Sequence, residues 1–285
     1  MQKPESARRY GELGLVSVSD KAWFRAGIDP PDLRTLGFRA SGGGAHQSKT
    51  MMLLELEILL AAGPLSPAAR QRLVIEENIL GKGSAAAKQS VLRQITNLYE
   101  LGGSGPVPAG LVTLWEIERE ARPILALLCA LARDPLLRDS AGPVLTASLG
   151  AQVSWANIAA TLAGLHPDRF SPAMLKSLAQ NCASSWTQSG HLKGHRDKRR
   201  VRAQATPVAA AYAALLASLA GFGGPALIAS PWMDVLDLSI NERLAQLGRA
   251  EALGLLRVRA AGDVVEIVLD PLLARIEAQS RVADV

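Results

Sequence analysis

The sequence predicts a mainly α-helical protein that carries short β-hairpins. Alanine and leucine, which favour helices, are abundant, whereas aromatic residues make up only 4% of the chain. Apolar residues recur at helical spacing between breaks that contain Gly and Pro. Two stretches next to turns instead alternate between apolar and polar residues, a pattern typical of hairpins. We therefore expect a helical bundle with helix-turn-helix-like or winged-helix-like modules, divided into residues 1–47, 48–101, 102–206 and 207–285.

Residues 1–47 are predicted to be irregular, because Asp29-Pro30-Pro31 and Ser41–Gly44 interrupt regular structure. Gly43–Thr50 comes close to a phosphate-binding loop. However, Ser48 stands where that loop needs glycine, and no apolar strand precedes it, so nucleotide hydrolysis is not expected. The segment should pack on the body of the protein through its apolar side chains, which are Trp23, Phe24, Leu33, Leu36 and Phe38.

Residues 48–101 should form a compact helix-turn-helix-like unit of three short helices. The third helix exposes Lys88 and Arg93, and Lys82 lies close to them in the preceding turn. These three cations are possible secondary phosphate contacts, although a role in surface solubility is the simpler interpretation. The expected helices cover about 49–62, 66–80 and 84–101.

Residues 102–206 are expected to contain a helix that suits a nucleic-acid groove. Ser171-Pro172 begins this helix, because the serine can cap it and the proline fits its first position. Leu175, Leu178, Cys182 and Trp186 make its apolar face. A second face carries no carboxylate that would repel phosphates, and its side chains are Ser177, Asn181, Ser184 and Gln188. Before this helix we expect a Gly/Pro linker at 102–110 and helices at about 112–122, 123–133 and 143–165.

A strongly basic hairpin is predicted directly after this helix. Gly190 ends the helix, and the following run contains one acid, Asp197. From Val201 onward apolar and polar residues alternate, which predicts a half-exposed strand. Helix, short strand, basic turn and strand is the order of a recognition helix and wing in a winged helix. The residues expected to contact phosphate are Lys193, His195, Arg196, Lys198, Arg199, Arg200 and Arg202.

The positive charge of the chain is concentrated around this hairpin. Residues 169–233 carry eight Lys/Arg and one acid, a net charge of +7, whereas the whole chain has a formal net charge of +5. We therefore expect a local phosphate-facing patch rather than a diffuse basic surface. The alternative interpretation is a solvated basic loop beside an ordinary core helix.

The C-terminal part, 207–285, repeats the order of helix and hairpin. Its first stretch is alanine-rich and free of charge. Gly221–Pro225 interrupt it after one short helix, so a buried helix is favoured over a membrane span. Ser239-Ile-Asn-Glu242 is a capping box, and 255–259 should pair with 264–268 as a hairpin. Because the net charge here is negative, this second winged-helix pattern is expected to support the structure or contact protein rather than read DNA.

Motifs for catalysis or metal binding are absent from the sequence. The four histidines have no Cys, Asp or Glu at metal-ligand or triad spacing, and there is no nucleophile elbow or dinucleotide fingerprint. Cys129 and Cys182 both lie on apolar helical faces and are expected to be buried thiols in a reducing compartment. The first residues lack the apolar core of a signal peptide. We expect a cytoplasmic protein that is not an enzyme and uses no cofactor or metal.

Several segments of the chain carry a family resemblance. Ser41-Gly-Gly-Gly-Ala45 leads to Leu53-Leu54-Glu55, and Glu76-Glu77-Asn78-Ile79-Leu80 precedes the Ser84-capped helix. Together with the helix and basic hairpin of 171–202, they resemble the BrxA-type proteins of bacterial BREX phage-exclusion systems over about residues 40–205. The resemblance implies a mostly helical, non-enzymatic, DNA-binding component of a defence system, with no catalytic residues to transfer. Relative to that family, residues 207–270 look like an extension.

The sequence therefore predicts binding of double-stranded DNA, largely through phosphates and without strong sequence preference. Other subunits of a defence complex are expected partners, and a membrane is not. Two alternatives stay open. One is a protein–protein interaction or scaffold subunit whose basic hairpin docks on an acidic partner, and the other is a winged-helix transcriptional regulator. Charge alone does not separate DNA from RNA, although aromatic stacking positions are few.

Overall fold

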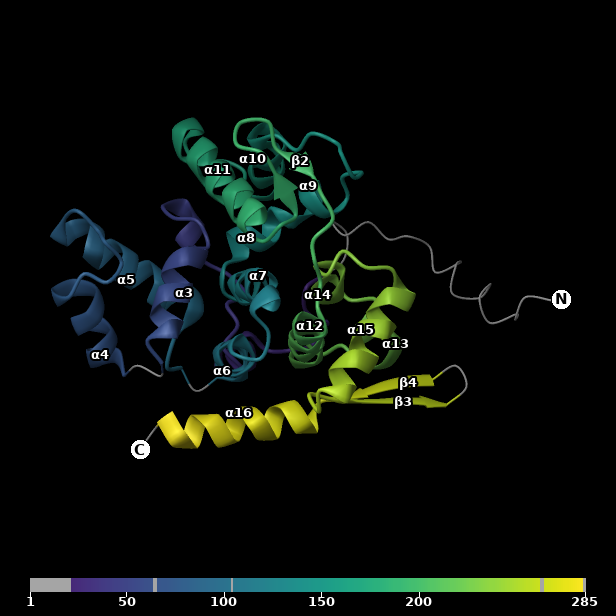
Figure 1. Cartoon of the computed structure of the whole chain (residues 1–285). Coiled ribbons are helices and arrows are strands. Elements are labelled where there is room, and N and C mark those ends of the chain that lie inside the picture. The colour runs from purple at the N-terminus through teal and green to yellow at the C-terminus, as the bar shows by residue number, and fades with distance from the viewer. Residues whose placement is uncertain (1–21, 64–65, 104, 262–263, 284–285) are drawn as a thin grey trace.

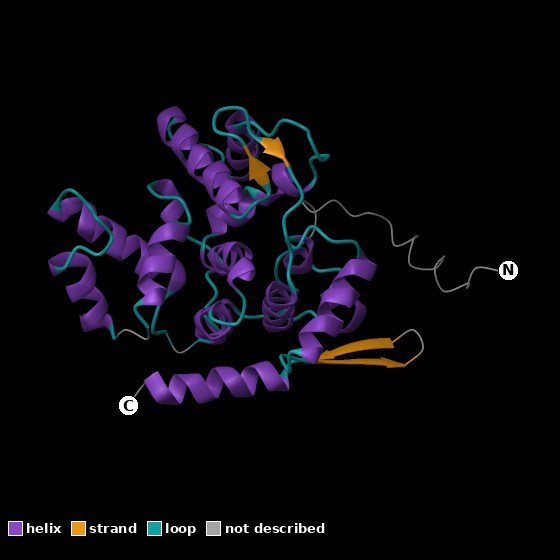
Figure 2. Cartoon of the chain, viewed as in Figure 1, coloured by secondary structure: helices purple, strands orange, loops and turns teal. Residues whose placement is uncertain are grey.

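The computed structural model describes residues 22–63, 66–103, 105–261 and 264–283. Within these residues the protein is mainly helical, as predicted, with two small antiparallel sheets of two strands each (Figures 1 and 2). The first helices are α2 (Pro30–Thr35), α3 (Leu53–Ala61), α4 (Pro67–Gln71), α5 (Ala85–Tyr99), α6 (Pro106–Trp115), α7 (Arg122–Arg133), α8 (Pro135–Asp139) and α9 (Ala141–Leu145). The later elements are α10 (Trp155–Leu165), α11 (Pro172–Gln188), β1 (Leu192–Lys193), β2 (Arg199–Arg200), α12 (Pro207–Leu219), α13 (Gly224–Ile228), α14 (Pro231–Asp234), α15 (Ile240–Ala252), β3 (Arg257–Ala261), β4 (Val264–Val268) and α16 (Asp270–Ala283).

Two almost wholly buried helices form the centre of the molecule. Every residue from Ile124 to Arg133 in α7 and from Val208 to Ala217 in α12 is buried. α7 packs against α5, α6 and α12, and α12 also packs against α14 and α15 (Figure 1). Small residues allow close approach between these helices. A Cβ atom on Gly110 of α6 would lie 3.0 Å from a methyl group of Leu215 in α12.

The predicted Gly/Pro linker at 102–110 is wrong, because α6 already begins at Pro106. Gly105 is the N-cap, and the prolines at positions 106 and 108 lie in the first turn. Backbone N–H groups have no intrahelical acceptor in that turn, so proline is tolerated there. α6 ends at Trp115 instead of residue 122.

Two N-terminal helices are shorter than predicted, because residues with a left-handed backbone limit them. α3 begins at Leu53 instead of residue 49, since Met52 has φ 53°. The helix predicted for 66–80 consists of α4 and a π-helical turn, Arg72–Glu76, and Asn78 with φ 52° ends it.

The region before the basic hairpin also differs from its prediction. The helical stretch expected at 143–165 is two helices, α9 and α10, with an irregular connection at 146–154. The strand expected from Val201 onward does not form. Regular pairing is confined to Leu192–Lys193 and Arg199–Arg200, although exposed and buried residues still alternate after Arg200.

Helix caps were predicted well. Ser84, Ser171 and Ser239 cap α5, α11 and α15 with their side chains, and Glu242 completes the capping box of α15. The second hairpin is confirmed as the pair β3 and β4, and its turn at 262–263 lies outside the described residues. The following helix, α16, was not predicted. It runs back along α6 at the base of the molecule in Figure 1.

The N-terminal segment packs on the body of the protein, as predicted. It is not irregular throughout, because α2 covers Pro30–Thr35 and the two prolines that were expected to interrupt structure stand in its first turn. Leu33 and Phe38 are buried. The rings of Trp23, Phe24 and Phe38 all contact the ring of Trp232 in α14. Segments more than 190 residues apart are thus joined by an aromatic cluster that fixes residues 22–38 against the C-terminal module.

Both cysteines are buried and free, as predicted. The alanine-rich stretch is α12, a buried helix of 13 residues. Among the helices that the structure describes, none has the length and apolar character needed to cross a membrane.

Candidate nucleic-acid interface

The basic hairpin follows α11 directly, as predicted, and residues 150–153 brace its second strand. Lys193 in β1 lies opposite Arg199 in β2. On the other edge of β2, the N–H of Val153 donates to the carbonyl oxygen of Lys198 (2.9 Å). The turn is therefore held between two chain segments instead of projecting as a loose loop.

Four basic residues at this turn are exposed. In the part of the chain that the structure describes, none has a carboxylate within ion-pair distance. Toward described residues, only Arg199 of the four donates a side-chain hydrogen bond, from Nη1 to the carbonyl of Gly150 (3.0 Å). The acid of the turn, Asp197, accepts a hydrogen bond from the Gln152 amide (3.2 Å). The four residues are Lys193, His195, Arg196 and Arg199.

Lys198 connects the turn to α11. Its Nζ donates to Oγ1 of Thr187 on the last turn of the helix (2.9 Å), and partial burial lowers its pKa. The side chain still exposes part of its surface. This bond places the basic turn and the C-terminal end of α11 side by side.

Two of the predicted phosphate contacts are already paired with carboxylates of the protein. Arg200 is only 2% exposed and pairs with Asp237 (2.7 Å). Because side chains alternate along a strand, Arg199 points outward and its neighbour points inward. Arg202 is half exposed but pairs with Glu242 (2.6 Å). Carboxylates therefore already neutralise both side chains.

The polar face of α11 is divided between an inner and an outer part. Asn181 donates to the carbonyl of His46 (2.9 Å). Gln188 accepts from the N–H of Leu53 (3.2 Å) and donates to Oγ1 of Thr50 (3.1 Å). These two side chains hold residues 46–53 on the helix, so their expected position facing a groove needs correction.

The outer part of the face stays open and is wider than predicted. Ser177 is exposed and Ser184 is partly exposed. Two further exposed residues of α11, Lys176 and Gln180, were missed by the sequence analysis, although residues 177, 180 and 184 have helical spacing. Lys176 lies over the ring of Trp155 at the start of α10 (5.3 Å).

Two of the three residues predicted as secondary phosphate contacts are already bonded within the protein. Lys82 pairs with Glu55 (2.8 Å), and Lys88 is partly buried and donates to the carbonyl of Ile75 (2.9 Å). Arg93 is exposed on α5. Of these three side chains, Arg93 is the one that is exposed and has no bond to a described residue.

A buried Asp–His–Ser network lies behind α11, and no motif in the sequence predicts it. Nδ1 of His46 lies 2.7 Å from Oδ2 of Asp134, and its Nε2 lies 2.8 Å from Oγ of Ser185. Separations of 88 and 139 residues along the chain explain why no local motif reveals it. The order of groups matches a nucleophile, a base and an orienting acid.

The Asp–His–Ser network lies in the core of the protein and not in a cleft. All three side chains have zero exposure, and Ser185 Oγ also accepts the N–H of Met51 (2.8 Å). Burial alone would raise the pKa of the Asp134 carboxyl, but the charge and hydrogen bonds of His46 bring it below its ordinary value. Gly44 passes so close that a Cβ would lie 1.7 Å from the Asp134 carboxylate. The network therefore fixes residues 44–51 between α8 and α11.

The second hairpin offers a different surface. Arg257 and Arg259 are exposed on β3, and Arg259 faces Glu266 of β4 (3.5 Å). Glu251 of the preceding helix accepts the N–H of Val258 (3.0 Å). One of the two exposed arginines here therefore has an acid partner on the neighbouring strand, in contrast to the exposed basic residues of the first hairpin.

Within the described ranges, no group of three His, Cys, Asp or Glu residues could hold a metal ion. No model of a known protein family matches the chain, and no curated protein matches it.

Proposed function

We propose that the protein binds duplex DNA, largely through phosphates and without catalysis, and that residues 141–200 are its DNA-binding winged-helix module. The element order supports this reading. α9, the segment 151–153, α10, α11, β1, the basic turn and β2 follow the order of a winged helix, with Gln152 of that segment bridged to Arg199 of β2. In helix-turn-helix proteins the second helix of the pair lies in the major groove.

One observation carries the proposal. The basic turn and the open face of α11 make one surface, joined by the bond from Lys198 to Thr187, and α11 contains no acid. A duplex that rests on this surface would meet cations from the turn and short polar side chains from the helix. The cations proposed to contact phosphate are Lys193, Arg196, Lys198 and Arg199, with Lys176 at the edge of the surface.

A salt-titrated gel shift with duplex DNA, single-stranded DNA and RNA of one sequence tests this function. Four phosphate contacts predict that log affinity for the duplex falls with log salt at a slope of about −3.6. A slope near zero contradicts the proposal, and so does tighter binding of RNA. Footprinting at fixed salt separates non-specific binding from a sequence-specific regulator.

The proposal includes a role as a subunit of a BREX-like phage-defence system, which is supported by the resemblance in residues 40–205. Deletion of the gene from a host that carries such a system should then raise the plating efficiency of phage. Partner subunits that co-purify after nuclease treatment, together with no shift of duplex DNA, would favour the protein-docking alternative instead.

A further inference from the structure

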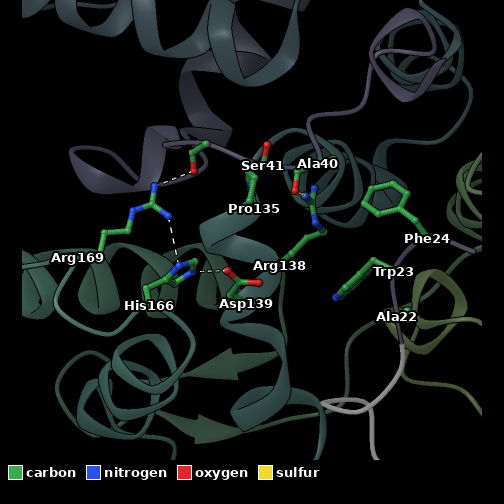
Figure 3. A pocket seen from close by; sticks show the side chains of 11 residues that line it. Ala22, Trp23, Phe24, Ala40, Ser41, Pro135, Arg138, Asp139, His166 and Arg169 are labelled. Carbon is green, nitrogen blue, oxygen red and sulfur yellow. Dashed lines mark hydrogen bonds and ion pairs between the residues drawn. The ribbon is translucent and has the colours of Figure 1, made fainter. Parts of the chain in front are cut away.

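A hollow of about 350 Å³ lies between the N-terminal segment and the turn that precedes α11. Figure 3 shows Trp23 and Phe24 on one side of it, Asp139, His166 and Arg169 on the other, and Arg138 between them. None of the residues that line it belongs to the proposed DNA-binding surface. The remaining lining residues are Ala22, Ala40, Ser41, Gly42 and Pro135.

Arg138 brings a buried positive charge to the wall of this hollow. It is 4% exposed, and its two Nη atoms donate only to backbone carbonyls, including those of Leu131 (2.6 Å) and Ala40 (3.2 Å). Among the described residues, no carboxylate lies within ion-pair distance of it, although Asp139 and Asp134 are near enough to raise its pKa. Burial lowers its pKa to about 10, so the group stays charged at neutral pH. The guanidinium lies 5.2 Å from the centre of the Phe24 ring.

The opposite wall adds a second guanidinium and one carboxylate. Nε2 of His166 lies 2.7 Å from Oδ2 of Asp139, and Nη1 of Arg169 donates to Nδ1 of the same ring (3.3 Å). Because a guanidinium can only donate, Nδ1 of His166 accepts this bond and its Nε2 faces the carboxylate. Arg169 also donates to the carbonyl of Gly42 (3.0 Å). Of the residues that line the hollow, two are arginines and one is an acid, Asp139, which is already bonded to His166. The buried Asp134 behind the wall also acts on Arg138, but it is paired with His46.

We propose that this hollow binds a small planar organic anion. The anionic group would face Arg138 and Arg169, where positive charge exceeds negative charge, and the ring would lie against Phe24 and Trp23. The volume suits a ligand no larger than a mononucleotide. A nucleoside monophosphate and an aromatic carboxylate share this chemistry, and titration distinguishes them.

Isothermal titration of the full chain with AMP, benzoate and inorganic phosphate at fixed ionic strength tests this inference. AMP or benzoate should saturate one site with a Kd below about 1 mM, and whichever binds identifies the anion. Phosphate alone should bind about tenfold more weakly than the ring-bearing probe, because it lacks the aromatic contacts. Absence of saturation by both organic probes would overturn the proposal. Equal affinity for phosphate and for the ring-bearing probe would show that the hollow binds an anion without recognising a planar ring.

Two variants in the hollow and one control variant locate the binding. Arg169→Gln should weaken binding about tenfold, whereas Arg249→Gln, on an exposed part of α15, should leave it unchanged. The bound probe should quench tryptophan fluorescence in the wild type and quench less in Trp23→Phe. Equal weakening by both arginine variants, or undiminished quenching without Trp23, would place the ligand elsewhere. Because DNA binding uses other residues, its failure would not affect these results.

Discussion

Replacing Arg196 and Arg199 with glutamine removes two of the four proposed phosphate contacts at the hairpin turn. Neither guanidinium has a carboxylate partner in the described chain, and the single hydrogen bond that Arg199 donates goes to a backbone carbonyl. The turn itself is held by backbone pairing. Stability of the double variant should therefore stay within about 0.5 kcal/mol of the wild type, while affinity for duplex DNA falls.

The size of the effect follows from counterion release. Each contact between a cation and a phosphate of B-DNA contributes about −0.9 to the slope of log affinity against log salt. The slope should therefore change from about −3.6 to about −1.8 in the double variant. At about 0.15 M salt, the two lost contacts correspond to about 2 kcal/mol, or roughly a 30-fold loss of affinity.

Fluorescence anisotropy of a short labelled duplex, titrated at several salt concentrations, measures this slope. The second hairpin supplies a matched control, because Arg257 and Arg259 are also exposed arginines on a strand. Their double replacement by glutamine should leave the slope unchanged. An unaltered slope in the first variant, or an equal change in both, would refute the assignment of DNA contacts to the first hairpin.

The remaining predictions concern stability. Asp237→Asn should cost about 2–3 kcal/mol in urea unfolding, because it leaves a buried arginine without its counter-charge, yet the DNA salt slope should not change. Burial holds the pKa of His191 at about 4, against an ordinary value of 6.5. As the pH falls, this histidine is therefore protonated in the unfolded chain before it is protonated in the folded protein. Unfolding free energy should therefore fall by about 3 kcal/mol between pH 7 and 4, and His191→Gln should flatten that decline. Gly44→Ala should destabilise by about 2–4 kcal/mol, because its methyl group collides with Asp134, whereas Gly83→Ala, with open space around it, should be nearly neutral. A small change in the first of these two variants would show that the Asp134 network can move aside.

Local chemistry explains what the sequence could predict. Ser171 before Pro172, and Ser239 three residues before Glu242, mark helix starts because a cap satisfies N–H groups of its own first turn. The two hairpins follow from alternation around turns. Pro106 was misread, because proline both breaks a helix interior and suits a helix start, and its neighbours alone do not decide between the two.

Tertiary partners explain what the sequence could not predict. Arg200 looks like its basic neighbours, and only the position of Asp237 reveals that it faces inward. The uncharged stripe on α11 is similar in sequence along its length, but residues 46–53 cover one part of it and leave the other open. The pairing of His46 with Asp134 joins residues far apart in the chain, so no spacing rule could identify it.

Hydrogen–deuterium exchange of the full chain, with and without a saturating short duplex, tests the proposed surface most directly. Duplex binding should slow exchange in α10, in the outer face of α11 and in the turn between β1 and β2, while β3 and β4 stay unchanged. Protection confined to the second hairpin, or no protection between residues 150 and 200, would contradict the proposed mode of binding.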